Sequence, residues 1–137
     1  MQTFLPYPSF SQTAKCLDYR RLGKQRIEAK QILQTLLGES DGWKNHPAVK
    51  MWRGYSSALA RYGFDICVEW VARGYKDNQR NWFFEKMFYP GVENPPWLGD
   101  PVFHASHRSN LLRKAPEWYG QFGWTEPNDL SYIWPVI

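Results

Sequence analysis

The sequence has little cysteine and no long hydrophobic run. Only two of its 137 residues are cysteines, Cys16 and Cys67, and both fall in helix-like segments without the spacing of metal ligands. No apolar stretch approaches the roughly 20 residues that span a bilayer, and no apolar run at the start precedes a cleavage site. These absences exclude a disulfide-stabilised scaffold and a membrane-spanning protein. We expect a protein of the reducing cytoplasm with no membrane partner.

The composition indicates a folded domain. Hydrophobic residues make up 43% of the chain and aromatic residues 18%, which argues against disorder. A chain of 137 residues is long enough to bury a core, and it contains no repeat, low-complexity segment or long linker. We therefore expect a single domain over residues 1–137.

Helix-end signals and apolar periodicity predict a first long helix near the N-terminus. It begins near Ser9 or Ser11, since either side chain can cap a helix. It ends at Leu37, because Gly38 suits the position just after a helix.

The second predicted helix, from Pro47 to Arg73, is the central core helix. Proline suits its first turn, and its apolar face continues to its end. Four large side chains on that face are expected to be buried: Trp52, Tyr55, Leu59 and Tyr62. Because glycine destabilises a helix interior, we expect a kink or break near Gly63.

The rest of the chain predicts shorter helices and irregular segments. A third helix is expected over roughly residues 77–88, and the proline-rich stretch 89–101 has too many breakers for regular structure. A fourth helix begins at Asp100 and Pro101 and ends before Pro116, and the aromatic tail is irregular. No segment alternates like a strand. The predicted fold class is mainly α: a compact single-domain helical fold with long loops.

One face of the first predicted helix is apolar at both ends but polar and charged in the middle. Residues spaced for one helix face are, in order, Ala14, Leu17, Arg21, Gln25, Glu28, Ile32 and Leu36. Two charges and an amide at the centre of an inward face are costly without partners, so we expect a functional site there. In the alternative, the helix is rotated about its axis relative to the core, and Arg21 and Gln25 lie at the solvent-exposed border of its core face. The core face would then consist of Leu22, Ala29, Leu33 and Leu36.

Basic residues concentrate in the same part of the chain, although the net charge is only +4. The cluster comprises Arg20, Arg21, Lys24, Arg26, Lys30, Lys44, Lys50 and Arg53. Such a cluster attracts polyanions, and eight Trp, eight Tyr and eight Phe are available to stack on bases. These features predict a DNA or nucleotide ligand. The alternative is a solvated cationic surface over an aromatic core.

The three histidines lack the pattern of a metal site. His104 and His107 are three apart, as two ligands on a helix would be, but only His46 supplies a further imidazole. We predict no metal and no cofactor. His104, His107 and Arg108 follow a helix start, which favours either phosphate binding or a capping or helix contact. His46, Lys50 and Arg53 share another helical face, as a second donor row or as a solvated face.

Short phrases along nearly the whole chain resemble a known enzyme family. The residues DYR (18–20) are similar to the start of the active-site helix in the pyrimidine-dimer DNA glycosylases, also called endonuclease V, of bacteriophages and bacteria. The segment EWVARG (69–74) looks like the end of that family's long second helix, and PEWY (116–119) resembles its C-terminal Pro-x-Trp-Tyr. HP (46–47) is similar to a His-Pro pair in bacterial relatives.

This resemblance implies a helical fold and a DNA glycosylase and lyase activity. Family enzymes attack C1′ of the sugar with a free N-terminal amine and form a Schiff base, aided by a glutamate directly after the active-site arginine. Here Arg21 follows Arg20, and in a shifted register Gln25 follows Lys24. The nearest carboxylate is Glu28, so the sequence departs from the family pattern at the catalytic acid.

Two further roles follow from the same resemblance. Methionine removal normally needs a small second residue, and because Gln2 is large the amine would be that of Met1. His107 falls near a family arginine that contacts the DNA backbone, so that role would pass to His107 or Arg108.

Two hypotheses remain open from the sequence. In the first, the protein is a base-excision glycosylase and abasic-site lyase, with Met1 as nucleophile and Glu28 as substitute carboxylate. The residues that would then hold phosphates around a flipped base are Arg20, Arg21, Lys24 and Arg53. In the second, the protein is a non-catalytic nucleotide or oligonucleotide binder, for example a phage sequestering protein. Arg21, Gln25 and Glu28 would then read the ligand.

Overall fold

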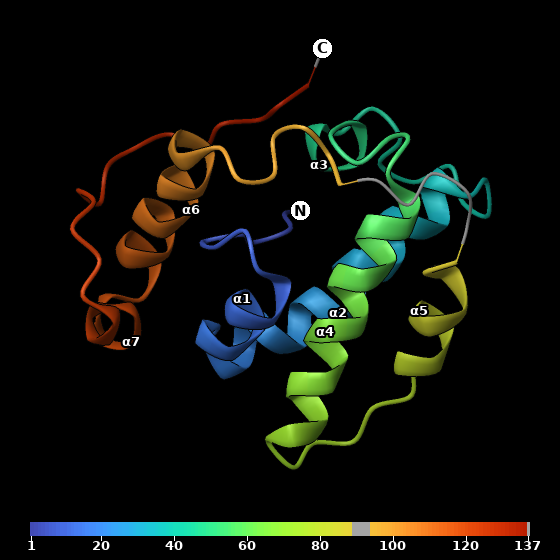
Figure 1. The fold of residues 1–137 in the computed structure, drawn as a ribbon, viewed down its shortest axis with the longest axis horizontal. Helices are drawn as coiled ribbons and strands as arrows, with labels where there is room; N and C mark the ends of the chain where they lie inside the picture. The colour runs from blue at the N-terminus through green and yellow to red at the C-terminus, as the bar shows by residue number, and fades with distance from the viewer. Residues whose placement is uncertain (89–93, 137) are drawn as a thin grey trace.

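Two long helices, α2 (Tyr19–Leu36) and α4 (Ser56–Ala72), pack against each other at the centre of the molecule (Figure 1). The structure is a computed structural model that describes residues 1–88 and 94–136. Its other elements are α1 (Phe10–Cys16), α3 (Pro47–Lys50), α5 (Arg80–Lys86), α6 (Pro101–Lys114), α7 (Pro116–Tyr119) and a 3-10 turn, η1 (Gly120–Phe122). Within the described ranges every regular element is helical, which confirms the predicted fold class.

The first predicted helix is two helices, which corrects the expectation of one helix to Leu37. Leu17 and Asp18 both have extended backbones, so the chain turns between α1 and α2. The backbone N–H of Asp18 donates a 3.1 Å hydrogen bond to the hydroxyl of Tyr119, which also contacts the Asp18 carboxylate. This partner, 101 residues away, holds the turn. At the N-terminus of α1, Ser9 is the cap.

The core face of α2 lies between the two alternatives: it contains Leu22, Ala29 and Leu33 of the rotated face and Gln25 and Ile32 of the first stripe, while Leu36 is only partly buried. Gln25 is completely buried rather than at a solvent-exposed border, whereas Arg21 and Glu28 are partly exposed. The α2 helix thus carries a buried polar group directly beside two charged ones.

The second predicted helix is also interrupted, but not at the expected glycine. The chain forms α3, then a turn through Gly54 with a φ of 88°, and then α4. Gly63 lies inside α4, which continues through it without a break. A glycine is needed at this position because the ring of Phe83 occupies the space that a side chain would take. As predicted, Trp52, Leu59 and Tyr62 are fully buried, while Tyr55 is only partly buried.

Later elements follow the predictions more closely. The α5 helix is shorter than the predicted 77–88, because the Asp77 carboxylate accepts hydrogen bonds from the backbone N–H groups of Gln79 and Arg80 before the helix starts. The α6 helix has the predicted limits, with Asp100 as its cap. The tail begins with two short helical turns, α7 and η1, where irregular structure was expected. Residues 89–93, part of the stretch predicted to be irregular, lie outside the described residues.

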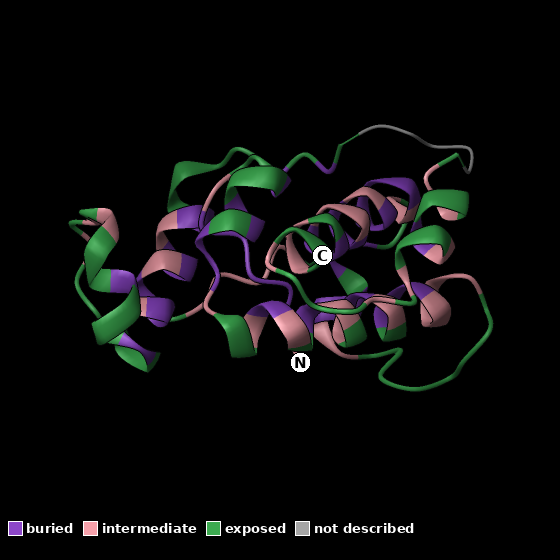
Figure 2. Cartoon of the chain, turned by 90° about the horizontal axis from the view of Figure 1, so that it is seen from below, coloured by how far each residue is buried: buried purple, intermediate pink, exposed green. Residues whose placement is uncertain are grey.

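The N-terminal segment, residues 1–6, passes between α6 on one side and α2 and α4 on the other (Figures 1 and 2). Residues 2–6 are buried although they form no regular element. Among the helices that the structure describes, none is long and apolar enough to cross a membrane.

Candidate functional site

Gln25 anchors the N-terminal segment to α2. Its amide oxygen accepts hydrogen bonds from the backbone N–H of Phe4 at 3.0 Å and from the hydroxyl of Tyr62 at 2.6 Å. Its amide nitrogen donates to the carbonyl of Gln2 at 2.8 Å and to Glu28 Oε2 at 3.2 Å. All four hydrogen-bonding positions of the side chain are therefore occupied by protein, and Gln25 acts as a structural clamp instead of reading a ligand.

Two histidines of α6 hold the same segment from the other side. His107 Nδ1 accepts a 2.9 Å hydrogen bond from the backbone N–H of Leu5, so the ring carries its proton on Nε2. His104 Nε2 accepts a 2.9 Å bond from the N–H of Gly99, and its Nδ1 lies 2.7 Å from the carbonyl of Leu5. Both rings are almost completely buried. They contact the chain's own backbone in place of a phosphate.

Burial keeps both imidazoles neutral. Loss of solvent, together with nearby positive charge, lowers the pKa of His107 from 6.5 to about 3. Burial also lowers the pKa of His104. Arg108, the third residue predicted to bind an anion, donates to both carboxylate oxygens of Glu126 and to the carbonyl of Pro6 at 2.7 Å. Its charge is thus already paired within the fold.

The anchored segment brings the chain's first residue to a cavity of about 570 Å³. The cavity is lined by Met1, Gln2, Phe4, Arg20, Arg21, Lys24, Gln25, Glu28 and Lys114. Both residues predicted to be catalytic, Met1 and Glu28, are in this set, together with three of the predicted phosphate-binding cations. The structure thus gathers residues from the N-terminus, from α2 and from the end of α6 around one space.

Glu28 is oriented toward the N-terminal segment. Its Oε2 accepts a 3.2 Å hydrogen bond from the backbone N–H of Gln2, the residue next to Met1. A second donor to the same oxygen is Gln25. Arg21, the nearest cation on the same helix stripe, forms an ion pair of 3.2 Å with Asp18 and not with Glu28. The Glu28 carboxylate therefore faces the cavity and the start of the chain.

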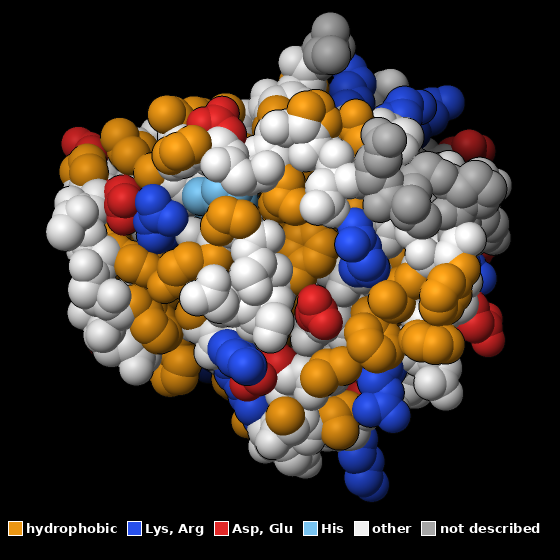
Figure 3. Space-filling view, in the orientation of Figure 1, with side chains coloured by type: hydrophobic (Ala, Val, Ile, Leu, Met, Phe, Trp, Pro, Cys, Tyr) orange, Lys and Arg blue, Asp and Glu red, His pale blue; other side chains and the backbone are white. Residues whose placement is uncertain are grey.

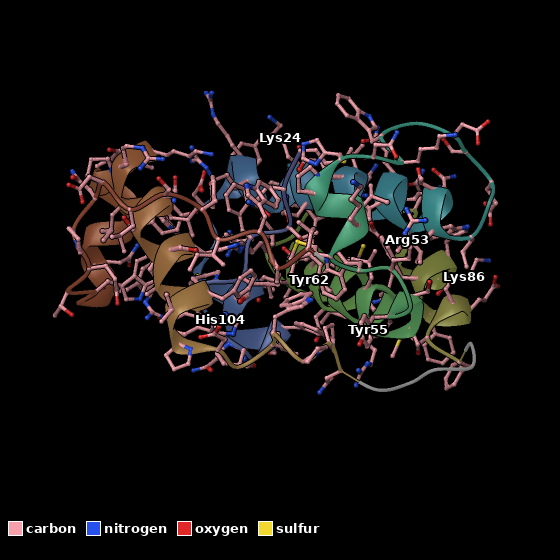
Figure 4. The ribbon with its side chains drawn as sticks, turned by 90° about the horizontal axis from the view of Figure 1, so that it is seen from above. Lys24, Arg53, Tyr55, Tyr62, Lys86 and His104 are labelled. Atoms are coloured by element: carbon pink, nitrogen blue, oxygen red, sulfur yellow. The ribbon has the colours of Figure 1, made fainter. Side chains whose placement is uncertain are left out.

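The remaining predicted cations do not join this cavity. Lys50 and Arg53 line a second hollow of about 480 Å³ beside Trp97 and the C-terminal tail. Arg53 also donates to the carbonyl of Lys44. Figure 4 shows Lys24 and Arg53 at separate places, and on the face drawn in Figure 3 basic side chains lie apart from one another. The sequence cluster is therefore not one continuous surface patch.

Other cations are already engaged by the fold. Arg26 pairs with Asp77 at 2.5 Å, and its guanidinium lies 5.1 Å from the centre of the Trp70 ring. Lys30 lies over Trp82.

His46 caps α3, since its Nδ1 accepts from the N–H of Ala48 at 3.0 Å. Its ring lies edge-on between Trp43 and Trp134. Burial and repulsion from the positively charged N-terminus lower its pKa.

The sequence reasoning missed Lys114, Gln2 and Phe4 as cavity residues. Gln2 and Phe4 line the cavity because hydrogen bonds with Gln25 hold the N-terminal segment against α2. No local sequence pattern predicted these long-range contacts. Lys114 enters because the end of α6 packs next to the start of the chain. A helix-end lysine carries no local signal of such a contact.

Clustered metal ligands and ionised thiols are both missing from the described residues. They contain no group of three or more His, Cys, Asp or Glu side chains that could hold a metal ion. Burial raises the pKa of Cys16 and of Cys67 to about 12, so both thiols are protonated at neutral pH. The chemistry available at the cavity is that of amines, guanidinium groups and one carboxylate.

The all-helical arrangement of the described residues is consistent with the glycosylase-like fold that the resemblance implied. Comparison with known families gives the same result. The family model described as pyrimidine dimer DNA glycosylase matches residues 1–82. The chain belongs to this family. The matched part includes Met1 and the whole of α2 but not α6. No curated protein and no solved structure matches the chain.

Proposed function

We propose that the protein is a DNA glycosylase and abasic-site lyase that acts on damaged or modified bases. Its family is one of DNA repair glycosylases, and this indicates DNA as the ligand. One observation carries the proposal: Glu28 accepts a hydrogen bond from the N–H of Gln2, within a cavity that Met1 also lines. This places a carboxylate next to the first residue of the chain.

An α-amine suits the nucleophilic role. Its ordinary pKa of about 8 leaves a useful unprotonated fraction at neutral pH, unlike that of an ordinary lysine. In the proposed reaction the Met1 nitrogen forms a bond to C1′ of the deoxyribose while the bond from C1′ to the base breaks. The base leaves with the bonding electron pair and takes up a proton, and the sugar ring opens to a Schiff base. Loss of a proton from C2′ then expels the 3′-phosphate by β-elimination, and water releases the enzyme.

Glu28 would serve the proton transfers of this reaction. Its carboxylate accepts the proton that the amine loses and stabilises positive charge that develops on the sugar. Because the Gln2 N–H and the Gln25 amide both donate to Oε2, they fix the orientation of the carboxylate. Arg20, Arg21 and Lys24 would bind the phosphates on either side of the reacting nucleotide.

The competing function is a non-catalytic nucleotide or oligonucleotide binder on the same fold. One observation favours it: the position after Arg20 holds Arg21, whose guanidinium pairs with Asp18, where the resemblance implies a glutamate. A binder would use the same basic cavity without forming a covalent bond.

Borohydride trapping on duplex DNA with one abasic site separates the two functions, because reduction makes a Schiff base permanent. We expect the protein with a free Met1 amine, verified by intact mass, to form a trapped adduct. Protein with an acetylated N-terminus, or with one residue added before Met1, should form none. A tetrahydrofuran site, which lacks the aldehyde, is the control DNA. Binding of both DNAs without trapping of either would leave the binder as the function.

A further inference from the structure

Lys114, the last residue of α6, lies at the junction of two hollows. It lines the cavity that holds Met1 and Glu28, and it also lines a groove of about 520 Å³ between the start of α2 and α7. Arg20 and Arg21 are shared by the two hollows as well. A chain of linked nucleotides with one unit in the cavity and the next in the groove would pass over these three cations.

The position of the Lys114 ammonium is defined by two aromatic rings. Its Nζ lies 5.1 Å from the centre of the Phe4 ring and 5.5 Å from that of Tyr132. Such contacts between a cation and an aromatic face restrict the amine without neutralising it. Phe4 belongs to the clamped N-terminal segment, so Lys114 is tied to the element that carries Met1.

The charge of Lys114 has no carboxylate partner among the described residues, whereas that of Arg21 is paired with Asp18. Partial loss of solvent and repulsion from Arg21, Arg113 and Lys24 lower the pKa of the amine, and attraction by the Glu28 carboxylate offsets only part of this effect. An anion placed beside Nζ would relieve this repulsion. The groove also carries two carboxylates, Glu117 and the Asp18 that pairs with Arg21, so the anion is expected between Lys114 and Arg20, on the cavity side of the groove.

We propose that Lys114 binds the phosphate linking the nucleotide in the Met1 and Glu28 cavity to its neighbour in the groove. In this position it is a positioning residue: it fixes the sugar relative to the Met1 amine without touching the reacting atoms. The inference rests on the proposed function for the identity of the ligand as a DNA strand, and it adds a phosphate contact outside the part of the chain that the family model matches.

Two variants of Lys114 and one matched control test this contact. Lys114→Gln removes the charge, and Lys114→Arg keeps it. The control is Lys86→Gln, since the Nζ of Lys86 also lies 5.1 Å from an aromatic ring, that of Trp82. Lys86 is on α5, at the other end of the molecule from α6 (Figures 1 and 4).

The first measurement is affinity for tetrahydrofuran-site duplex DNA over a series of salt concentrations. We expect Lys114→Gln to weaken binding about fivefold to tenfold and to reduce the salt slope by about one. Lys114→Arg and Lys86→Gln should bind like the parent protein, and melting temperatures should show that all variants are folded. Equal affinity and slope for Lys114→Gln and Lys86→Gln would overturn the proposal.

The second measurement is trapping on abasic DNA at saturating protein. If Lys114 positions the sugar, Lys114→Gln should trap more slowly and Lys114→Arg should restore the rate. A complete loss of trapping in both variants with unchanged affinity would make Lys114 the nucleophile, and would overturn the phosphate contact. If the parent protein traps nothing, the proposed lyase function fails, while the affinity series still decides whether Lys114 binds a phosphate.

Discussion

The hydroxyl of Tyr62 in α4 donates a 2.6 Å hydrogen bond to the amide oxygen of Gln25 in α2, in a site completely closed to solvent. The same hydroxyl lies 2.8 Å from the carbonyl of Phe4. Three segments distant in sequence, the N-terminal segment, α2 and α4, thus meet at one pair of side chains beneath the candidate site.

Gln25→Ala should therefore destabilise the protein strongly. The change leaves the N–H of Phe4 and the carbonyl of Gln2 without their partner, while the hydroxyl of Tyr62 keeps only the carbonyl of Phe4, so we expect a loss of about 3 kcal/mol in the free energy of unfolding. Urea denaturation measures this value. Gln31→Ala, at an exposed position of the same helix, should change it by less than about 0.5 kcal/mol. Equal effects of the two changes would contradict the clamp.

Glu28→Gln should abolish most trapping while leaving DNA affinity within about tenfold. The two side chains are nearly isosteric but differ in charge and proton transfer. Because Arg21 pairs with Asp18 and not with Glu28, no ion pair is lost and the melting temperature should hardly change. Glu39→Gln, in the exposed loop after α2, is the control. A variant that traps like the parent would remove Glu28 from the mechanism.

Lys24→Glu should weaken DNA binding and flatten its salt dependence. Lys24 lines the Met1 cavity, and reversal of its charge repels the phosphates expected there. Arg53→Glu should have the smaller effect, because Arg53 lines the other hollow. Fluorescence anisotropy with labelled duplex DNA at several salt concentrations compares them. A larger effect at Arg53 would move the DNA to the second hollow.

Mild acid should destabilise the fold through His107. The unfolded imidazole takes up a proton below its ordinary pKa of 6.5, but the folded one does so only near 3, so stability falls as the pH decreases through this window. Between about pH 7 and about pH 5 the loss should reach about 2 kcal/mol. His104 shifts in the same direction and adds to the loss.

The check is His107→Asn, which retains an acceptor for the N–H of Leu5 but does not titrate. Its unfolding free energy, although lower at neutral pH, should depend less on pH over the same window. A pH dependence as steep as that of the parent would assign the effect to other groups.

Gly63→Ala should be destabilising although alanine is the better helix former. A Cβ at this position would overlap the ring of Phe83, and overpacking typically costs about 1 to 3 kcal/mol. Gly120→Ala is the comparison, since its Cβ would meet no atom and its backbone is already helical. Thermal unfolding of both variants tests this, and a stabilised Gly63→Ala would contradict the close approach.

Local patterns predicted the features that depend on neighbours along one helix. The spacing of Arg21, Gln25 and Glu28 indicated a polar site on α2, and the structure brings all three to one cavity. The limits of α6 followed from Asp100 and its proline. Each of these signals lies within a few residues of the feature that it predicts.

Features that depend on distant partners were not predictable in this way. The break between α1 and α2 is held by a hydrogen bond from Asp18 to Tyr119. The two histidines of α6 form hydrogen bonds with the backbone of Leu5, about a hundred residues away. Gly63 looked like a helix breaker, because nothing near it in the sequence pointed to the ring of Phe83. Lys114 likewise could be placed at the cavity only once the fold was known.

The hydrogen bonds of Leu5 with His104 and His107 limit when, during synthesis, the N-terminal segment can reach its folded position. These contacts span 99 and 102 positions, so the start of the chain reaches its final place only after α6 has been synthesised and has folded. During translation the first residues emerge earliest, and their contacts with Gln25 and Tyr62 can form before those with α6. A nascent chain that ends before α6 therefore lacks both histidine contacts to Leu5 and the contribution of Lys114 to the cavity, so the site reaches its full geometry only after α6 has been added.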